Sequence, residues 1–242
     1  IGQIGPSLVS LVHQEELSRY PQDSVWLRSE SPSPFDIDRQ PPAGLRRDFE
    51  PELVAEIGRV VDALEEKLKY YFELALVEPA LIGRLSGIGI LRPEDVRRFS
   101  AVGPVARAAG IMDDTRIIEP YGVFREIAVA GVTDDHCDVY GRTIVRVKEM
   151  LESVRLIRVM LKELPDGPIS VKAPRRVPAG EILIRVEAPR GEDIHYVRST
   201  GGDTPDRVRV RAPTEANWHG MSYMLEGFHL ADVPIIIAAI DP

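Results

Sequence analysis

VEAPRGEDIHYV, residues 186–197, is the stretch that decides the fold of the C-terminal part of this chain. Apolar and polar residues alternate around a Pro-Arg-Gly sequence at positions 189–191. Such alternation is typical of half-buried strands, and proline and glycine favour a tight turn between them. We therefore predict a hairpin whose tip carries Arg190, with Glu187 and Glu192 close to it.

The same alternation continues on both sides of this hairpin. EILIRVEA (181–188), DIHYVRS (193–199) and RVRVRA (207–212) are each typical of a short strand, and TGGDTP (200–205) predicts the turn between the last two. A last helix is expected over residues 214–230. The apolar run VPIIIAAI (233–240) is expected to form a buried strand or a core segment.

Upstream of residue 170 the apolar period is helical. Apolar residues recur at spacings of three and four along a segment that begins near Glu50 and along a second one from about Gly141 to Leu164. A shorter helix restarts after Pro93, with acidic residues in its first turn. The PDGP sequence at 165–168 ends the second long helix.

These patterns predict an α+β fold that is mainly α: a bundle of long helices with a small antiparallel β-sheet in the C-terminal half. Residues 1–48 are expected to be a poorly defined N-terminal segment and linker, since 29–48 are rich in proline, serine and charge. A helical bundle is expected over 49–170. A sheet with a C-terminal helix is expected over 171–242, packed on the bundle as one unit. Because residue 1 is isoleucine, we expect the natural protein to begin upstream.

Composition narrows the class of protein. The 242 residues carry a formal charge of −8 and 6% aromatic residues, which argues against a nucleic-acid partner. No apolar stretch approaches the length that crosses a bilayer. Cys137 is the single cysteine, so no disulfide can form within the sequence, and a reducing compartment is indicated.

The arginines near the hairpin have two interpretations. The arginines of RVRVR share one face of a strand and can simply be solvated. Alternatively, Arg190 and Arg211 are held inward by carboxylates, because a guanidinium stays charged and binds carboxylates in a fixed fork. The candidate carboxylates are those of Glu187, Glu192 and Asp241.

Several motifs along the chain together resemble a known family. They are AGLRRDF (43–49), GRLSGIGIL (83–91), VGPVARAAGI (102–111), DVYGRTIVRVKEMLESVRLIR (138–158), the hairpin, GGDTPDRVRVRAPTEAN (201–217) and GFHLADVPIIIAAIDP (227–242). Their order and spacing resemble the large subunit of energy-converting, membrane-associated nickel–iron hydrogenases. They equally resemble the homologous quinone-site subunit of respiratory complex I. The resemblance covers about residues 43–242 and implies a hydrogenase large-subunit-like fold.

The resemblance implies a set of site residues. Arg190 corresponds to the family arginine that overhangs the nickel–iron centre, with Pro189 beside it. Asp241 corresponds to the aspartate that contacts this arginine, and Thr214 to a hydroxyl near a diatomic ligand on iron. A second group of candidates lies around them: Glu187, Glu192, Arg211, Asp138 and His195.

Two of these candidates also have a structural interpretation. Asp138 opens an Asp-x-Tyr-x-Arg sequence and is expected to cap the following helix, although the resemblance places the segment near the quinone cavity of complex I relatives. His195 could relay protons, since its charge changes near neutral pH. On a strand beside Tyr196, we expect it to be a hydrogen-bonded structural histidine.

The cysteine content conflicts with the hydrogenase resemblance. The family's metal site needs four thiolates from two Cys-x-x-Cys pairs, and neither pair occurs in residues 1–242. Three explanations stay open: part of a longer hydrogenase subunit, a complex I-type subunit that forms a quinone cavity, or a scaffold that has lost the metal site. We expect no metal on this chain alone, a nickel–iron centre if flanking cysteines exist, and a quinone in the complex I alternative.

The resemblance also implies partners. Electrons must leave the site through an iron–sulfur cluster, and this sequence has too few thiolates to hold one. A small iron–sulfur subunit and membrane subunits are therefore expected. Through them the protein would lie on the cytoplasmic, inner face of the cell membrane.

Overall fold

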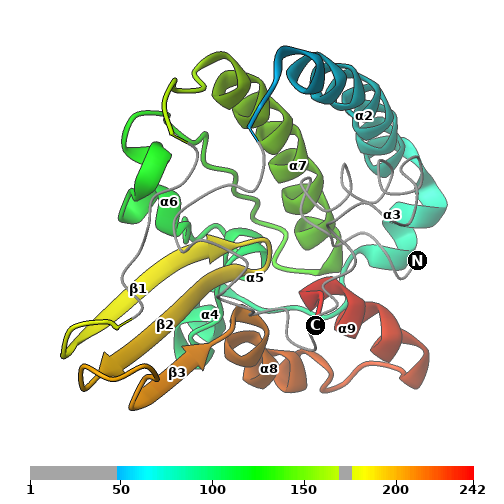
Figure 1. Ribbon diagram of the computed structural model, residues 1–242. Coiled ribbons are helices and arrows are strands. Elements are labelled where there is room, and N and C mark those ends of the chain that lie inside the picture. Colours follow the sequence, from blue (N-terminus) through cyan, green and yellow to red (C-terminus); the bar gives the residue numbers. More distant parts are fainter. Residues whose placement is uncertain (1–47, 169–175) are drawn as a thin grey trace, which may run out of the picture.

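The computed structural model describes residues 48–168 and 176–242. Figure 1 shows helices that surround one side of a small twisted sheet. The predicted mainly helical fold with a three-stranded antiparallel sheet is confirmed. The expected N-terminal segment, except Asp48, lies outside the described residues, and the division of the chain into units stays a prediction.

The helical elements follow one another along the chain before and after the sheet. They are α2 (Pro51–Val77), α3 (Pro79–Leu85), α4 (Pro93–Phe99), α5 (Pro104–Arg107), α6 (Thr115–Ile118), the 3₁₀ turn η1 (Gly122–Arg125), α7 (Val139–Lys162), α8 (Pro213–Met224), the 3₁₀ turn η2 (Leu230–Asp232) and α9 (Val233–Ile240). Within the described ranges, none of these helices has the length and apolar character of a membrane span.

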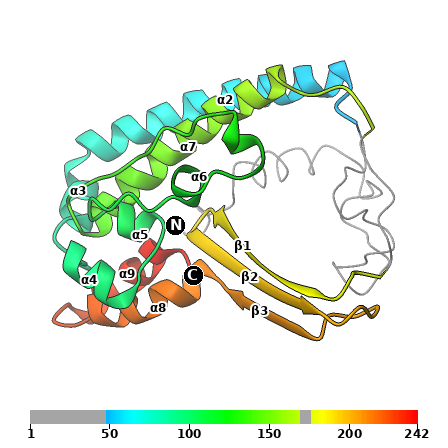
Figure 2. The same cartoon turned by 90° about the vertical axis from the view of Figure 1, so that its left-hand side faces the viewer.

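The long helices α2 and α7 pack side by side, as Figure 2 shows. Val61 and Leu68 of α2, which lie two helical turns apart, and Val154 of α7 are buried between them. The predicted cap of α7 is confirmed, because the Asp138 carboxylate accepts a hydrogen bond from Gly141 N at 2.8 Å. Burial of these aliphatic side chains holds the two helices together.

A second core lies where the shorter helices meet the first half of α7. Its fully buried members include Val105 and Ala106 of α5, Met224 of α8, and Ile236 and Ile240 of α9. Of the two expectations for residues 233–240, the buried strand is wrong, because this segment is α9, whereas the core segment is confirmed. Pro234 in the first turn favours a helix start, and Ile236 and Ile240 share one helical face that is completely buried.

The last predicted helix also differs from the structure. Helix α8 ends at Met224 rather than near residue 230. Gly227 has a φ of +81°, a conformation that glycine adopts without strain, and the chain reverses there before η2. The reversal lets α9 pack on both α8 and α7.

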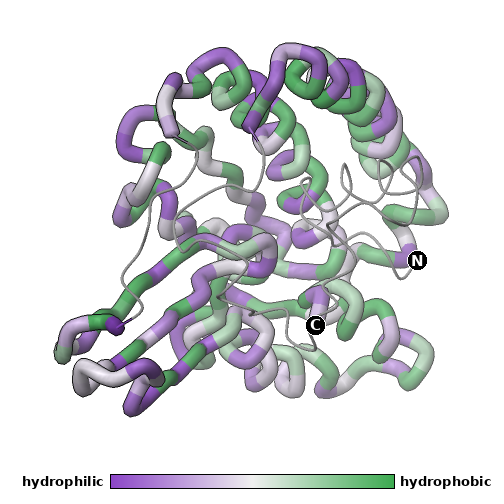
Figure 3. Tube along the Cα trace, in the orientation of Figure 1, coloured by the Kyte–Doolittle hydropathy of each residue, from purple (hydrophilic) through white to green (hydrophobic). Residues whose placement is uncertain are grey.

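The sheet has the strand order β1 (Gly180–Ala188), β2 (Gly191–Ser199), β3 (Arg207–Arg211). Ala188 pairs with Gly191, so Pro189 and Arg190 form the two-residue tip of the predicted hairpin. Figure 3 shows hydrophobic and hydrophilic residues mixed along each strand, as the alternation requires. The tip lies among the helices, whereas the far end of the sheet projects away from them (Figure 2).

The contact between α2 and α7 leads to a first prediction. Leu68 is 5% exposed and Leu76, on the same helix, is 46% exposed. Leu68→Ala should lower the free energy of unfolding by roughly 2–4 kcal/mol, since it opens a cavity in a packed interface. Leu76→Ala should change it by less than about 0.5 kcal/mol. Urea unfolding followed by circular dichroism measures both, and equal effects would contradict the packing described here.

Candidate functional site

The hairpin tip brings Arg190 against the end of α9. The Arg190 Nε lies 3.3 Å from Asp241 Oδ2 and also donates to the main-chain oxygen of Asp241. Asp241 has a left-handed φ of +55°, which turns both its carbonyl and its carboxylate toward the guanidinium. The Arg190 side chain is 33% exposed, so it is partly buried while Asp241 holds its Nε.

Two glycines set the position of the tip. Gly103, which precedes α5, and Gly191, which follows the tip, both have positive φ values. A Cβ on Gly103 would overlap Arg190 O and Gly191 Cα, and one on Gly191 would lie 2.7 Å from Gly103 N. Only glycine allows this approach of two backbones. The tip therefore rests directly on the connection between α4 and α5.

That connection is itself fixed from α8. Asn217 is completely buried and binds both polar groups of one residue's backbone. Val102 N donates to Asn217 Oδ1 at 2.9 Å, and Asn217 Nδ2 donates to Val102 O at 3.3 Å. Gly103 N donates to Asp113 Oδ2 at 2.9 Å. With its polar groups satisfied, this segment can stay buried beneath the hairpin tip.

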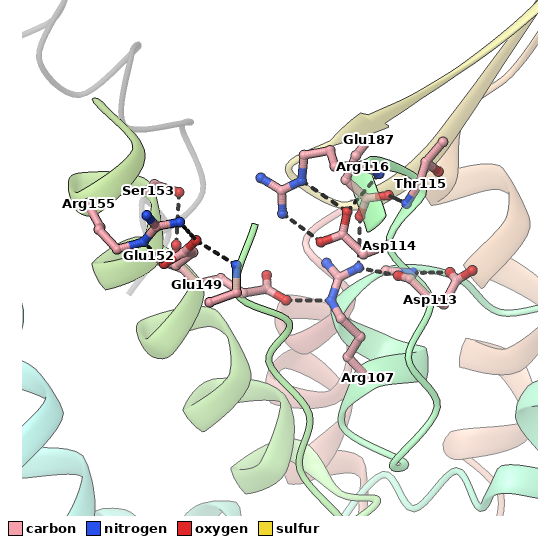
Figure 4. Close-up of polar contacts among 12 residues, drawn as sticks. Arg107, Asp113, Asp114, Thr115, Arg116, Glu149, Glu152, Ser153, Arg155 and Glu187 are labelled. Atoms are coloured by element: carbon pink, nitrogen blue, oxygen red, sulfur yellow. Dashed lines mark hydrogen bonds and ion pairs between the residues drawn. The ribbon is translucent and has the colours of Figure 1, made fainter. Parts of the chain in front are cut away.

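The end of β1 next to the hairpin tip is held by a buried arginine, Arg107, at the end of α5. Figure 4 shows its guanidinium between Glu149 of α7, Asp113 and Glu187 of β1. Nη1 lies 2.8 Å from Glu187 Oε1 and donates to Asp113 O, while Nε donates to Glu149 Oε1. The other oxygen of Glu187 accepts from Thr115 N at 2.9 Å. Arg107 thus joins α5, α7 and β1 through one planar group.

Burial and neighbouring charges shift the pKa values of the ionisable groups in this cluster. Burial would lower the pKa of Arg107, but the negative charges of Glu149 and Glu187 outweigh it and raise that pKa. Burial raises the pKa of Glu187 despite Arg107, and the nearby Asp114 carboxylate raises it further. Burial would also raise the pKa of Asp114, but its hydrogen bonds with Arg116 lower it. Arg107 is therefore a fixed cation, whereas Glu187 is the group that resists ionisation.

Two further arginines of α7 approach the site from behind. Arg146 Nη1 lies 3.4 Å from Asp241 Oδ2, and its Nη2 donates to Ala239 O at 3.2 Å. Arg142, one turn earlier, is 1% exposed and donates to Gly89 O at 2.6 Å. Burial lowers the pKa of Arg146, and lowers that of Arg142 to about 10. The Asp241 carboxylate is thus shared between Arg190 and Arg146.

The carboxylates proposed from the sequence divide among different arginines. Asp241 contacts Arg190, as described above. Glu192, which is buried, lies 2.9 Å from Arg211 Nη1 and accepts from Arg185 Nε at 2.6 Å. Glu187 contacts Arg107 rather than Arg190. Arg190 and Arg211 are therefore paired with different acids, and each of these acids also binds a second arginine.

The other candidates from the sequence lie at varying distance from this pair in the fold. Pro189 is exposed beside Arg190 at the tip. Thr214 is half-buried in the first turn of α8, and no hydrogen bond joins it to Arg190 or Asp241 among residues 48–168 and 176–242. His195 Nε2 lies 3.1 Å from Asp193 Oδ2 on the sheet. The two carboxylate oxygens of Asp138 accept hydrogen bonds from Gly87 N and Gly141 N, so Asp138 caps the start of α7.

Sequence reasoning missed Arg107, Glu149, Arg146 and Asn217. One signal was present: Arg107 is the only charged residue in the apolar segment VGPVARAAGI, and a buried charge requires a partner. Nothing in the spacing identifies Glu149 as that partner, because it lies 42 residues further along. Asn217 carries no local signal at all, since its role depends on a backbone brought to it by folding.

The residues present do not fit a nickel–iron centre. Cys137 supplies one thiol, which donates to Asp135 O at 3.3 Å, and burial raises the pKa of this thiol. A four-thiolate site needs ionised sulfurs, and residues 1–242 contain no second cysteine. Asp134, Asp135 and His136 place ligand atoms within 4.8 Å of one another on the loop before α7. The Asp134 carboxylate already binds His136, which accounts for the grouping.

Comparison with known proteins decides the family. Residues 39–177 and 170–242 match the family described as the respiratory-chain NADH dehydrogenase 49 kDa subunit. The chain belongs to this family.

Members with curated names fall into two kinds. The chain is 34% identical over 208 residues to a carbon monoxide-induced hydrogenase of Rhodospirillum rubrum, covering 86% of the chain and 55% of that protein. It is 36% identical over 200 residues to an NADH-quinone oxidoreductase subunit of Dehalococcoides mccartyi, covering 82% and 54%. Formate hydrogenlyase subunit 5 of Escherichia coli is 34% identical over 199 residues, covering 82% and 35%. The chain thus spans about half the length, or less, of these relatives.

A solved structure has the same fold. The membrane-bound sulfane sulfur reductase, an archaeal respiratory membrane complex, contains a chain that superposes with a TM-score of 0.77 at 31% identity. The match covers 83% of the present chain and 57% of the other. The large-subunit-like fold predicted from the motifs is therefore confirmed.

The opposite shifts of Glu187 and Asp114 give a prediction for stability against pH. The folded pKa of Glu187 lies above its ordinary value of 4.5. In the pH window between these two pKa values the native state keeps Glu187 protonated, whereas the unfolded state has released that proton. The contribution of Glu187 to stability is therefore lost as pH rises through the window. The folded pKa of Asp114 lies below its ordinary value of 3.8. The contribution of Asp114 to stability is therefore present above pH 3.8 and is lost as pH falls from there through the folded pKa.

Two variants measure these contributions separately. We compare Glu187→Gln and Asp114→Asn with the unsubstituted chain by urea unfolding from about pH 3 to about pH 7. The advantage of the unsubstituted chain should shrink with rising pH in the first comparison and grow in the second. The same sign of slope in both would contradict the environments described here.

Proposed function

We propose that this chain is part of the large, catalytic-type subunit of an energy-converting hydrogenase complex, an oxidoreductase acting on dihydrogen and protons. Of the relatives described above, one is named a hydrogenase and matches 86% of the chain, and another is named a formate hydrogenlyase subunit. The single observation that carries the proposal is the Arg190–Asp241 pair at the hairpin tip.

Arg190 would act as a fixed positive charge and hydrogen-bond donor. Both of its contacts to Asp241 use Nε, which leaves Nη1 and Nη2 without partners among the described residues. A guanidinium stays protonated in proteins, so these nitrogens suit the orientation of a substrate and the stabilisation of negative charge. Donors that are held before the reaction begins stabilise a transition state at little further cost.

Asp241 would be a positioning residue. Its carboxylate lies between Arg190 and Arg146, so each guanidinium fixes the acid for the other. Pro189 would stiffen the tip, because its ring fixes φ just before Arg190. Glu187, through Arg107, and Glu192, through Arg211, would hold the strands that carry the tip. Thr214 would line the same site with its hydroxyl.

A nickel–iron centre requires donors that this sequence does not supply. With one cysteine in residues 1–242, the four thiolates would have to come from residues outside them. When bound, such a centre supplies the redox chemistry on dihydrogen. Arg190 and Asp241 would supply a positioned charge beside it.

The second candidate is a complex I-type subunit that contributes to a quinone site. The match to the 49 kDa subunit family and the single cysteine favour this alternative. The Nη groups of Arg190, which have no partner among the described residues, would then bind a quinone oxygen, since a guanidinium suits an oxygen that gains negative charge. A scaffold that has lost the site is the third possibility, and the experiment below separates all three.

Partners and location follow from the same proposal. The names of the relatives describe subunits of larger enzymes, and the solved relative is part of a membrane complex. We infer a small iron–sulfur subunit that carries electrons away from the site, and membrane subunits that hold the assembly at the inner face of the cell membrane.

The test is Arg190→Lys in the purified complex. Lysine keeps the charge but loses the planar fork, so hydrogen-dependent dye reduction should fall roughly 10²–10³-fold. Arg155→Lys is the matched control, because the one ion pair of this exposed arginine among the described residues is with Glu152, and its activity should persist.

Two assays on the same preparation separate the candidates. Loss of hydrogen-dependent dye reduction in the Arg190→Lys complex supports the hydrogenase. The second candidate is supported if the unsubstituted complex has no hydrogenase activity and the variant loses quinone reduction. Full activity of an assembled Arg190→Lys complex would refute the assignment of Arg190. Absence of both activities from the unsubstituted complex would leave only the scaffold.

A further inference from the structure

One face of the sheet is apolar and exposed, with no layer over it among the described residues. The strand register places Ile182 opposite Val197 and Val197 opposite Val208, so these side chains form a row across all three strands. A second row contains Ile184, His195 and Val210. Paired residues on neighbouring strands lie on the same face. We call the face formed by these two rows the outer sheet face.

The outer sheet face has no covering layer in the described part of the chain. Ile182, Ile184, Val208 and Val210 are 54%, 47%, 44% and 50% exposed. Figure 2 shows that the end of the sheet away from the hairpin tip projects beyond the helices. A sheet normally buries its apolar face against another layer, and a contiguous exposed patch of aliphatic residues marks an interaction surface.

The edge of β3 adds a second, independent feature. β3 pairs with β2 alone, so its other edge is unpaired among the described residues. Arg198 and Arg211 have acidic partners, Asp206 and Glu192. Arg207 and Arg209, by contrast, make no ion pair within residues 48–168 and 176–242. An unpaired edge is a template for another strand, and these two charges select what that strand carries.

Alternation along β3 defines the partner. Val208 and Val210 lie on the outer sheet face, while Arg207 and Arg209 lie on the opposite face. A strand added to this edge would place every second side chain beside the valines and the others beside the arginines. Apolar residues suit the first set and carboxylates the second.

We propose that the β3 edge and the outer sheet face bind a strand-forming segment of a partner subunit in which apolar residues alternate with Asp or Glu. A second copy paired edge to edge would bring Arg207 and Arg209 against each other, which like charges oppose. A lipid surface is disfavoured, because the outer sheet face contains none of the Trp and Tyr residues typical of membrane interfaces. This inference does not depend on which redox reaction the complex performs.

Photo-crosslinking in the assembled complex identifies the occupant. A benzophenone amino acid replaces Val208 on the outer sheet face, and in a control it replaces the exposed Glu66 of α2. We expect the first to crosslink to one segment of another subunit that has the alternating pattern. The second should not reach that segment. Mass spectrometry of the crosslinked peptides reads out both.

Charge reversal then tests the recognition. The double variant Arg207→Glu, Arg209→Glu should reduce the amount of partner that co-purifies by more than about tenfold, because like charges then face each other. Arg97→Glu, Arg98→Glu on α4 makes the same change in net charge on another exposed surface and should keep the partner. Changing the crosslinked acids to arginine should restore binding to the first double variant.

Folding of each double variant is checked by circular dichroism, and Arg207→Ala, Arg209→Ala replaces a reversal that fails to fold. The inference is overturned if the double variants at 207 and 209 retain the partner. It is equally overturned if Val208 crosslinks only to residues 1–47 of its own chain, to a second copy or to lipid.

Discussion

The structure depends on one buried guanidinium. Arg107 lies where α5, α7 and β1 meet, and it binds Glu149, Glu187 and Asp113 O while only 1% exposed. Removing one partner from such a group costs roughly 3–5 kcal/mol, because a charge is then left buried and unpaired. The ion pairs therefore define a single arrangement of these elements. In that arrangement the end of β1, two residues before Arg190, is held against the helical body.

A second constraint acts on the other side of the hairpin tip. Gly103 and Gly191 touch through their backbones, and Asn217 of α8 fixes the segment that carries Gly103. Asp241 at the end of α9 then meets Arg190, with Arg146 of α7 behind it. The pair that we propose as the functional centre is thus built by contributions from α5, α7, α8, α9 and two strands. Its geometry is a property of the whole fold rather than of one loop.

Local patterns predicted most of the elements and few of the pairings. The helices α2 and α7 and all three strands follow from apolar period, and the Asp138 cap follows from the residues that begin α7. VPIIIAAI could not be assigned from its composition, because a short apolar run fits a buried strand or a buried helix. Charge alone offered Asp241, Glu187 and Glu192 as partners for Arg190, and only the resemblance singled out Asp241. The pairing of Arg107 with Glu149 and Glu187 was out of reach, since it joins residues 42 and 80 positions apart that no period connects.

The two ends of the sheet differ in their surroundings. The end near the tip is fixed by buried charge and carries the proposed site. Among the described residues, the far end has an exposed apolar face and an arginine edge without ion pairs, which we propose bind a neighbour. The most direct test of the account is a double-mutant cycle on the free energy of unfolding with Arg107→Met and Glu187→Gln. We expect a coupling of roughly 2–3 kcal/mol, with the double variant less destabilised than the two single effects added together. Additive effects, within about 0.5 kcal/mol, would show that the buried pair does not hold the hairpin and would contradict it.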